Sequence, residues 1–392
     1  MSLLNNELLS IMIQVLSNNI ISSLGYTTEE NYANVKAGVT KGTLHEGMFD
    51  LPEPFFGSLL DWTEIDGLVE RELAPSMRLT RFEKIILLSA KRAIGKAGID
   101  PCSPEVLFVL STTKGNVSLL GNDEGFEADR AQLWRSAQIL GDYFGNPNEV
   151  VVVSNACISG VAAQLLAFDL MRTHGYRYAV VVGGDILSKF VVSGFQSFKA
   201  LSPSRCKPFD AERVGLNLGE AAATMVFEQV EDSTSLPADS FVWRGGGNRN
   251  DANHISGPSR TGEGLYNATT LAMKNVKKED IAFICAHGTA TRYNDDMESW
   301  AISRAGLSEV PTFSLKGYYG HTLGAAGLLE CILSQSALSD GCILPTLGYE
   351  QYGVVQPMTI CERLIATEKS CFLKLISGFG GSNAVICYER VR

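Results

Sequence analysis

Short runs of β-branched and other apolar residues alternate along the chain with longer stretches in which apolar residues recur at helical spacing. The short runs of the first part predict strands over Val106–Leu110, Val150–Val153, Tyr178–Val182 and Ala222–Phe227. The longer stretches predict helices over Arg81–Lys96, Ile158–Arg172 and Thr322–Leu338. Such alternation predicts an α/β protein with parallel sheets covered by helices on both faces.

A polar break, EDSTSLPADS at residues 231–240, separates this series from a second one. The second series predicts strands over Phe241–Arg244, Ile281–Ala286, Thr312–Ser314, Cys371–Ile376 and Ala384–Tyr388. We therefore expect two comparable α/β halves, residues 1–235 and 236–392, although no duplication is visible as sequence identity.

Composition and charge narrow the class of protein. The 392 residues are 45% hydrophobic and 19% charged, as in ordinary globular proteins, and the net charge of −10 argues against a nucleic-acid partner. The nine cysteines are scattered and form no C-x-x-C pair, which favours free thiols in a reducing compartment. No Lys or Arg precedes Lys36, so the cationic start of a signal peptide is missing, and no apolar run is long enough to span a bilayer. We expect a cytoplasmic protein.

Cys157 stands where a predicted strand ends and a predicted helix begins, in the segment VVVSNACISG. The first N–H groups of a helix lack internal partners and carry partial positive charge, which stabilises a thiolate and a developing oxyanion. The small neighbours Ala156, Ser159 and Gly160 leave room for a substrate carbonyl. A buried structural cysteine explains the position equally well when Cys157 is considered alone.

His287 and His321 each follow a predicted strand within a glycine-rich context, AHGTATRYNDDME and LKGYYGHTLGAAG. In open α/β sheets ligands bind in the crevice at the strand ends, so these histidines and Cys157 form a candidate constellation. Lys316 precedes His321 in apolar surroundings, which indicates partial burial with a carboxylate partner. Asp295, Glu298 and Glu330 are the nearest candidates for that partner by motif. The segment SGFGGSNA near the C-terminus is compatible with close approach to a ligand, and also with a plain β-turn.

Taken together, SNACISG, KPFDAERVGLNLGEAAA, AHGTATRYNDDME, LKGYYGHTLGAAG and SGFGGSNA resemble the β-ketoacyl-[acyl-carrier-protein] synthases of the elongating, decarboxylating kind, in the thiolase superfamily. The resemblance covers nearly the whole chain. It implies a thiolase-like duplicated αβαβα layered fold, with the nucleophile in the first half and the two histidines in the second.

The resemblance also implies a role for each matching residue. Cys157 would accept the acyl group, and His287 and His321 would assist decarboxylation of malonyl-carrier protein. The backbone N–H groups of Cys157 and Phe379 would form the oxyanion hole, with Gly380 beside them and the Phe379 side chain as a gate. Lys316 and Glu330 would form a buried pair that orders the site, with Asp295 and Glu298 in support. The hydroxyl groups of Thr289 and Thr291 would contact the phosphopantetheine arm.

The implied reaction is that of a 3-oxoacyl-[acyl-carrier-protein] synthase. An acyl-cysteine intermediate would condense with malonyl-carrier protein in a decarboxylative Claisen reaction, in fatty-acid, polyene or polyketide synthesis. The implied partners are acyl carrier protein and a second subunit, giving a homodimer or a heterodimer with a related synthase. No cofactor and no metal are implied. Arg78, Arg81, Lys84, Arg205 and Lys207 are candidates for a basic patch that receives the acidic carrier, although each of them also fits a solvated surface.

Four departures from the family pattern, Ile158, Val214, Ala221 and Ser377, leave the catalytic set intact and concern substrate specificity, as does the loop STTKGNV at 111–117. The main alternative is a non-catalytic partner subunit like the chain-length factors of type II polyketide systems, which have lost the nucleophile. Thiolases and starter-condensing synthases commonly replace one of the histidines. A zinc site at Cys285 and His287 lacks further ligands at suitable spacing.

Overall fold

The computed structural model describes residues 12–120, 125–231 and 236–391. Its main sheet has eleven strands. The first half supplies β1 (Met12–Ser22), β4 (Val106–Ser111), β5 (Val151–Val153), β6 (Tyr178–Asp185) and β8 (Ala221–Val230). The second half supplies β9 (Phe241–Asn250), β10 (Ile281–Cys285), β11 (Pro311–Phe313), β13 (Thr359–Ile360), β15 (Cys371–Gly378) and β16 (Ser382–Arg390). One small sheet contains β2 (Thr43–His45), β3 (Phe55–Ser58) and β7 (Leu218–Gly219). Another contains β12 (Cys342–Ile343) and β14 (Ile365–Ala366).

The two halves of the main sheet repeat one strand order. From the outside inward the first half runs β5-β4-β6-β8-β1, and the second runs β11-β10-β15-β16-β9, with β13 added at its edge. The strand directions match as well, because β4 and β10 are parallel to both neighbours whereas β8 and β16 are antiparallel to both. The halves meet where β1 pairs with β9. The expected boundary at residue 235 lies outside the described residues, and the division into two domains stays a prediction.

The expectation of parallel sheets was wrong, because the sheet is mixed. Gly378 pairs directly with Ser382, so only three residues connect β15 to β16. A connection of that length makes a hairpin, whereas a parallel neighbour would need a crossover of a dozen residues or more. The glycine-rich SGFGGSNA segment is therefore the hairpin that turns the last strand back along the sheet.

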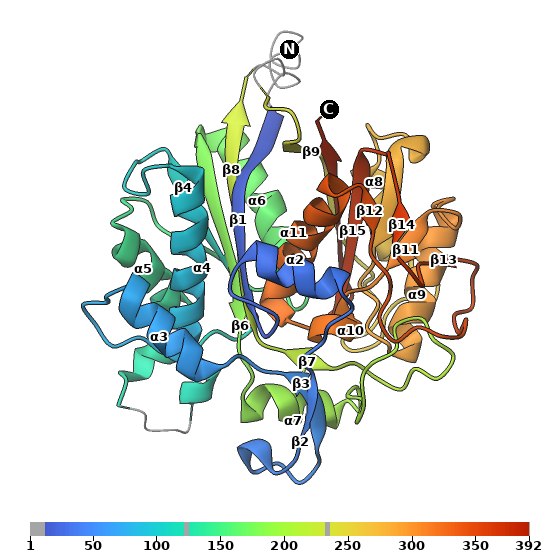
Figure 1. The fold of residues 1–392 in the computed structure, drawn as a ribbon, viewed down its shortest axis with the longest axis horizontal. Coiled ribbons are helices and arrows are strands. Elements are labelled where there is room, and N and C mark those ends of the chain that lie inside the picture. The colour runs from blue at the N-terminus through green and yellow to red at the C-terminus, as the bar shows by residue number, and fades with distance from the viewer. Residues whose placement is uncertain (1–11, 121–124, 232–235, 392) are drawn as a thin grey trace.

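Helices form three layers around the two halves of the sheet (Figure 1). The outer layers contain α3 (Trp62–Glu72), α4 (Arg81–Ala97) and α5 (Leu133–Phe144) on one side, and α8 (Glu263–Ala272) and α9 (Arg292–Arg304) on the other. Between the halves lie α2 (Thr28–Lys36), α6 (Ser159–His174) and α11 (Ala326–Ser339). The shorter helices are α7 (Lys189–Ser197) and α10 (Lys316–Tyr319). This layering confirms the expected αβαβα fold.

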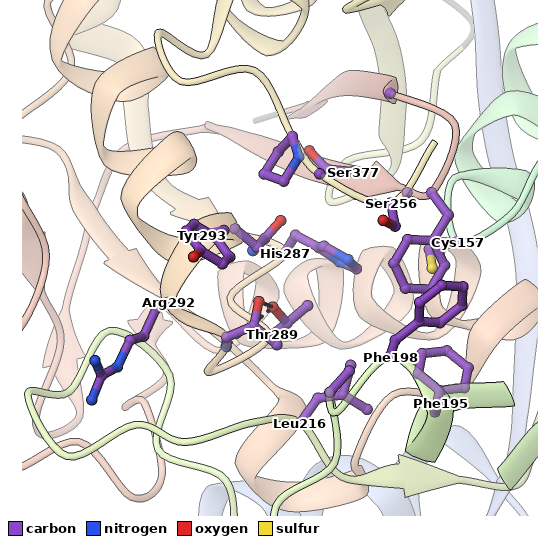
Figure 2. Close-up of a pocket in the computed structure, with 18 of the residues that line it drawn as sticks. Cys157, Phe195, Phe198, Leu216, Ser256, His287, Thr289, Arg292, Tyr293 and Ser377 are labelled. Atoms are coloured by element: carbon purple, nitrogen blue, oxygen red, sulfur yellow. Dashed lines mark hydrogen bonds between the residues drawn. The ribbon is translucent and has the colours of Figure 1, made fainter. Parts of the chain in front are cut away.

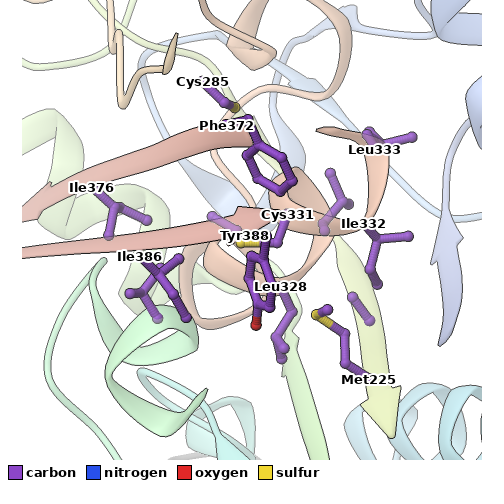
Figure 3. Packing of buried hydrophobic residues seen from close by; sticks show 14 of the residues in the cluster. Met225, Cys285, Leu328, Cys331, Ile332, Leu333, Phe372, Ile376, Ile386 and Tyr388 are labelled. Carbon is purple, nitrogen blue, oxygen red and sulfur yellow. The ribbon is translucent and has the colours of Figure 1, made fainter. Parts of the chain in front are cut away.

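Helix α11 is buried along nearly its whole length because both halves of the sheet cover it. Leu328, Cys331 and Ile332 lie in one buried cluster with Phe372 and Tyr388 from β15 and β16 (Figure 3). The helix begins later than the predicted Thr322–Leu338, since a 3₁₀ turn occupies residues 323–325. No helix in the described ranges is long and apolar enough to cross a bilayer.

Helix α4 begins at a capping box, in which Thr80 and Glu83 satisfy each other's backbone N–H groups. Glu83 is fully buried, and its two carboxylate oxygens accept from Nε and Nη2 of Arg130 at 2.7 Å each. The helix start is therefore fixed by a buried ion pair that also anchors the segment before α5.

Candidate active site

Cys157 lies in the turn between β5 and α6, as the sequence predicted. The turn is sharp because Ala156, which is not glycine, has a φ of 44°. The Phe379 N–H lies within hydrogen-bonding reach of the Cys157 thiol. Burial raises the pKa of this thiol to about 11, opposed by the positive charge of Lys316 and by the Phe379 N–H. The expected lowering of the thiol pKa by the helix terminus is therefore absent, since desolvation outweighs it.

Two glycines bring the start of α6 against the start of α11. A Cβ on Gly327 would lie 2.5 Å from the Val161 backbone nitrogen, and one on Gly160 would lie 2.9 Å from the Gly327 Cα. Only glycine fits at a contact this close. The nucleophile turn and the His321 segment, which precedes α11, are thereby held at a fixed separation.

His321 is fixed by the backbone on both sides. Its N–H donates to the Asn217 carbonyl at 2.7 Å, and its Nδ1 accepts from the Leu323 N–H at 3.2 Å. Burial, with Lys316, holds the pKa of the imidazole well below its usual value. In the neutral ring an accepting Nδ1 leaves the proton on Nε2, so His321 can present a hydrogen-bond donor.

His287 follows β10, and carboxylates of α9 hold the backbone around it. Glu298 accepts from the His287 N–H at 2.7 Å and from the Gly288 N–H at 2.6 Å, while Asp295 accepts from the Thr289 N–H at 3.0 Å. Burial raises the pKa of Glu298 to about 7 and that of Asp295 to about 6. Burial, with Lys316, also lowers the pKa of the His287 imidazole well below its usual value.

The thiol and the two imidazoles converge on one point. Figure 2 shows the His287 ring directed toward Cys157. Cys157 and one nitrogen from each of His287 and His321 lie within 4.8 Å of one another, and the two rings meet edge to face at 5.1 Å. Among the described residues Cys285 belongs to no cluster of three or more possible metal ligands, so the zinc hypothesis gains no further ligand. A buried thiol beside two neutral donors can carry an acyl group and stabilise an oxyanion.

Lys316 is fully buried and pairs with Glu330, while Asp295 and Glu298 bind backbone N–H groups instead. Sequence reasoning missed Lys374, a second fully buried lysine whose ammonium pairs with the other oxygen of Glu330. Its signal was a single charged residue within the apolar run CFLKLIS of a strand buried on both faces.

Two cavities meet at Cys157. The larger, about 530 Å³, contains His287, His321, Thr289 and Thr291, and the two threonine hydroxyls are 2.8 Å apart. Two of the departures from the family pattern, Val214 and Ser377, also line it.

The smaller cavity, about 240 Å³, is lined mainly by apolar side chains, together with Thr113 and Lys114. Phe195, Phe198 and Phe379 line both cavities, and the Phe379 ring centroid lies 5.8 Å and 5.0 Å from the other two. Sequence reasoning did not single out residues 189–198, because only the fold brings them to the nucleophile.

Other expected residues are placed differently. The Gly380 N–H donates to the Ile255 carbonyl at 2.7 Å, so it is already engaged and does not face the thiol. Neither cavity is lined by any member of the expected basic patch, Arg78, Arg81, Lys84, Arg205 and Lys207. The cations on the wall of the larger cavity are Lys199 and Arg292.

Comparison with known proteins identifies relatives along most of the chain. Residues 64–233 match the β-ketoacyl synthase N-terminal domain, and residues 241–350 match the β-ketoacyl synthase C-terminal domain. Nodulation protein E of Rhizobium sp. (strain N33) is 30% identical over 357 residues, 84% of this chain and 87% of that protein. The tetracenomycin polyketide synthase ketoacyl synthase alpha subunit of Streptomyces glaucescens is 29% identical over 361 residues, 83% of this chain and 84% of that protein. The solved structure of the ishigamide ketosynthase/chain length factor superposes with a TM-score of 0.86 at 25% identity, over 97% of this chain and 99% of that one.

Proposed function

Because this chain belongs to the β-ketoacyl synthase family of condensing acyltransferases, we propose that it is a catalytic condensing subunit in which Cys157 carries the acyl chain. The observation that supports this proposal is the convergence of the Cys157 thiol with two neutral imidazoles within 4.8 Å, where two cavities meet. A subunit without catalysis would have no need to hold these three groups together.

In the first half-reaction the acyl group moves from the carrier thioester to Cys157. The Cys157 sulfur attacks the thioester carbonyl, the bond to the carrier sulfur breaks, and the thiol proton leaves with the carrier thiol. Backbone N–H groups of Cys157 and Phe379 would bind the oxyanion of the tetrahedral intermediate. The buried Lys316 ammonium opposes the rise in the thiol pKa and so favours the attacking thiolate.

In the second half-reaction malonyl-carrier protein loses CO₂, and the electron pair of the broken C–C bond becomes an enolate. The neutral His287 and His321 imidazoles would donate hydrogen bonds to the enolate oxygen. The enolate carbon then attacks the acyl-Cys157 carbonyl, which forms the 3-oxoacyl-carrier product and returns the Cys157 thiolate to be protonated. Because decarboxylation supplies the carbanion, this chemistry needs no cofactor.

The proposed substrates are carried on phosphopantetheine, whose arm would lie in the larger cavity beside Thr289 and Thr291. Lys199 and Arg292 are then the cations placed to meet an acidic carrier protein at this cavity. The double variant Lys199→Glu/Arg292→Glu should raise KM for carrier-bound substrate but not for a free pantetheine thioester. Lys207→Glu is the control, since Lys207 already pairs with Glu212 and lines neither cavity. Equal effects on both substrates would contradict this docking site.

The smaller cavity is the proposed acyl pocket. Phe190 lines it and is 58% exposed, an exposure that a second subunit would reduce. We therefore propose a dimer, either of two copies of this chain or with a related synthase subunit. Light scattering of the purified chain would show a dimer in the first case and a monomer in the second.

The proposed function is tested by intact mass and peptide mapping after mixing the protein with acyl-carrier proteins of different chain type. One acyl adduct on Cys157, absent in Cys157→Ala, is the expected result. The acyl group preferred would separate fatty-acid, polyene and polyketide pathways. If the folded wild-type protein acquires no adduct from any donor, the chain is instead a partner subunit like a chain-length factor.

A further inference from the structure

Lys374 lies in the middle of β15 and is fully buried. Its ammonium pairs with Glu330 and also donates to three backbone carbonyls, those of Leu375 at 2.7 Å, Ala286 at 3.1 Å and Cys285 at 3.3 Å. Cys285 is the last residue of β10, and Ala286 directly precedes His287. The ammonium therefore binds the end of the strand that carries one of the two imidazoles.

Charge balance indicates that Lys374 does more than complete an ion pair. Glu330 already has a buried cationic partner in Lys316, and that pair alone is neutral. A second buried ammonium gives the group Lys316, Glu330 and Lys374 a net positive charge, which is costly unless its contacts and the nearby buried Glu298 carboxyl offset the lost hydration. Those contacts are made with Glu330, with β15 itself at Leu375, and with the end of β10 at Cys285 and the following Ala286.

The His287 backbone is thus held from two directions. Glu298 accepts from the His287 and Gly288 N–H groups, and Lys374 donates to the carbonyls of the two residues before them. Removal of the Lys374 contacts frees the carbonyl side only. The Cys157 turn, in contrast, is held by α6, α11 and the Phe379 segment. Within the described residues, the polar contacts of the Lys374 ammonium reach these elements only at Glu330 of α11.

We propose that Lys374 is a positioning residue for the decarboxylation half-reaction, which fixes the end of β10 so that the His287 imidazole meets the enolate oxygen. This inference rests on the proposed function. It predicts that loss of Lys374 slows decarboxylation of malonyl-carrier protein and leaves acylation of Cys157 nearly unchanged.

The test measures the two half-reactions separately in Lys374→Met and Lys374→Gln. Acylation is followed as the mass adduct on Cys157, and decarboxylation as CO₂ release from malonyl-carrier protein by the pre-acylated enzyme. Both variants should fold, because Glu330 retains Lys316 as its partner. Lys369→Met is the matched control, since Lys369 donates to the Ile281 carbonyl at the opposite end of β10.

The expected result in Lys374→Met is a decarboxylation rate about 10- to 100-fold lower, as displacement of a catalytic group by up to about 1 Å produces, with acylation within about threefold of wild type. Lys374→Gln, which keeps N–H donors without the charge, should lie between Lys374→Met and wild type. Lys369→Met should change neither half-reaction by more than about twofold.

Three results would overturn the assignment: equal loss of both half-reactions, loss of neither, or failure of both Lys374 variants to fold, which would make Lys374 a requirement of the fold itself. If wild type shows no acylation and no decarboxylation, the proposed function fails, and the inference fails with it.

Discussion

The contact between α6 and α11 gives the sharpest test of how the site is held, through Gly327→Ala. The new Cβ would lie 2.5 Å from the Val161 nitrogen, whereas ordinary contact begins near 3.4 Å, 0.9 Å farther away. The opposing atoms belong to the backbone of Gly160 and Val161, so no side-chain rotation relieves the contact. The start of α6, and Cys157 with it, must therefore move relative to the His321 segment by an amount of this order.

The effects on stability and on activity should separate. Overpacking costs about 1–3 kcal/mol, and alanine regains up to about 1 kcal/mol over glycine within a helix. The variant should thus fold with a net loss of roughly 0–2 kcal/mol. Displacement of the nucleophile by close to 1 Å should lower the condensation rate about 100-fold.

The assay is the steady-state condensation rate together with urea unfolding, compared with Gly95→Ala in α4. A Cβ on Gly95 meets no atom within 4 Å, so this control should gain about 0.5–1 kcal/mol and keep full activity. A Gly327→Ala variant that is fully active and as stable as the control would refute the reasoning.

Three further predictions concern ionisable side chains. The pKa of His321 is lower in the folded chain than its unfolded value of about 6.5, so below pH 6.5 the unfolded chain binds more protons at this residue than the folded chain does. The stability that the neutral ring contributes is therefore complete above about pH 6.5 and is lost as the pH falls below it. Between pH 7.5 and pH 5.5 the free energy of unfolding, measured in urea, should therefore fall by about 1.4 kcal/mol less in His321→Gln than in wild type. Equal falls in the two proteins would contradict this. Lys114→Leu should raise the ratio of the Cys157 acylation rates with saturated and with 3-oxoacyl donors about tenfold, because a saturated chain then no longer desolvates an ammonium. The ratio cancels the rise in the thiol pKa that loss of the Lys114 charge also causes, and an unchanged ratio would oppose a role of Lys114 in the pocket. Glu83→Gln should cost about 3–5 kcal/mol in chemical denaturation, since Arg130 keeps a buried charge without its counter-charge, and a loss below about 1 kcal/mol, typical of surface pairs, would contradict it.

The sequence predicted those features that depend on short segments. The strand–helix junction at Cys157 and the strand ends at His287 and His321 follow from local hydrophobic patterns, and the motifs carry the resemblance to the family. The layered fold was expected from the same resemblance. These predictions succeed because periodicity and turn-forming residues are properties of neighbouring positions.

The features that sequence reasoning missed depend on contacts between distant segments. The basic patch stays a prediction, because none of its residues lines either cavity, and Arg81, for example, stacks on the Trp62 ring. The thiol pKa was misjudged because burial at the meeting point of two halves is invisible from the junction alone. Lys374 was overlooked because its partner Glu330 is 44 positions away and comes within reach only when β15 packs against α11.

The repeated strand order has a consequence for how specificity can change. The smaller cavity is built almost entirely from residues before position 200, whereas His254–Pro258 and Thr289–Asn294 contribute much of the larger one. In the proposed function the first repeat thus recognises most of the acyl chain, and the second repeat supplies much of the wall around the carrier arm. Phe195, Phe198 and Phe379 line both cavities. Substitutions at first-repeat residues that line only the smaller cavity, such as Phe190 and Val191, can therefore alter which chain is extended without disturbing delivery of the extender. The two recognition problems can evolve, or be engineered, independently at such positions.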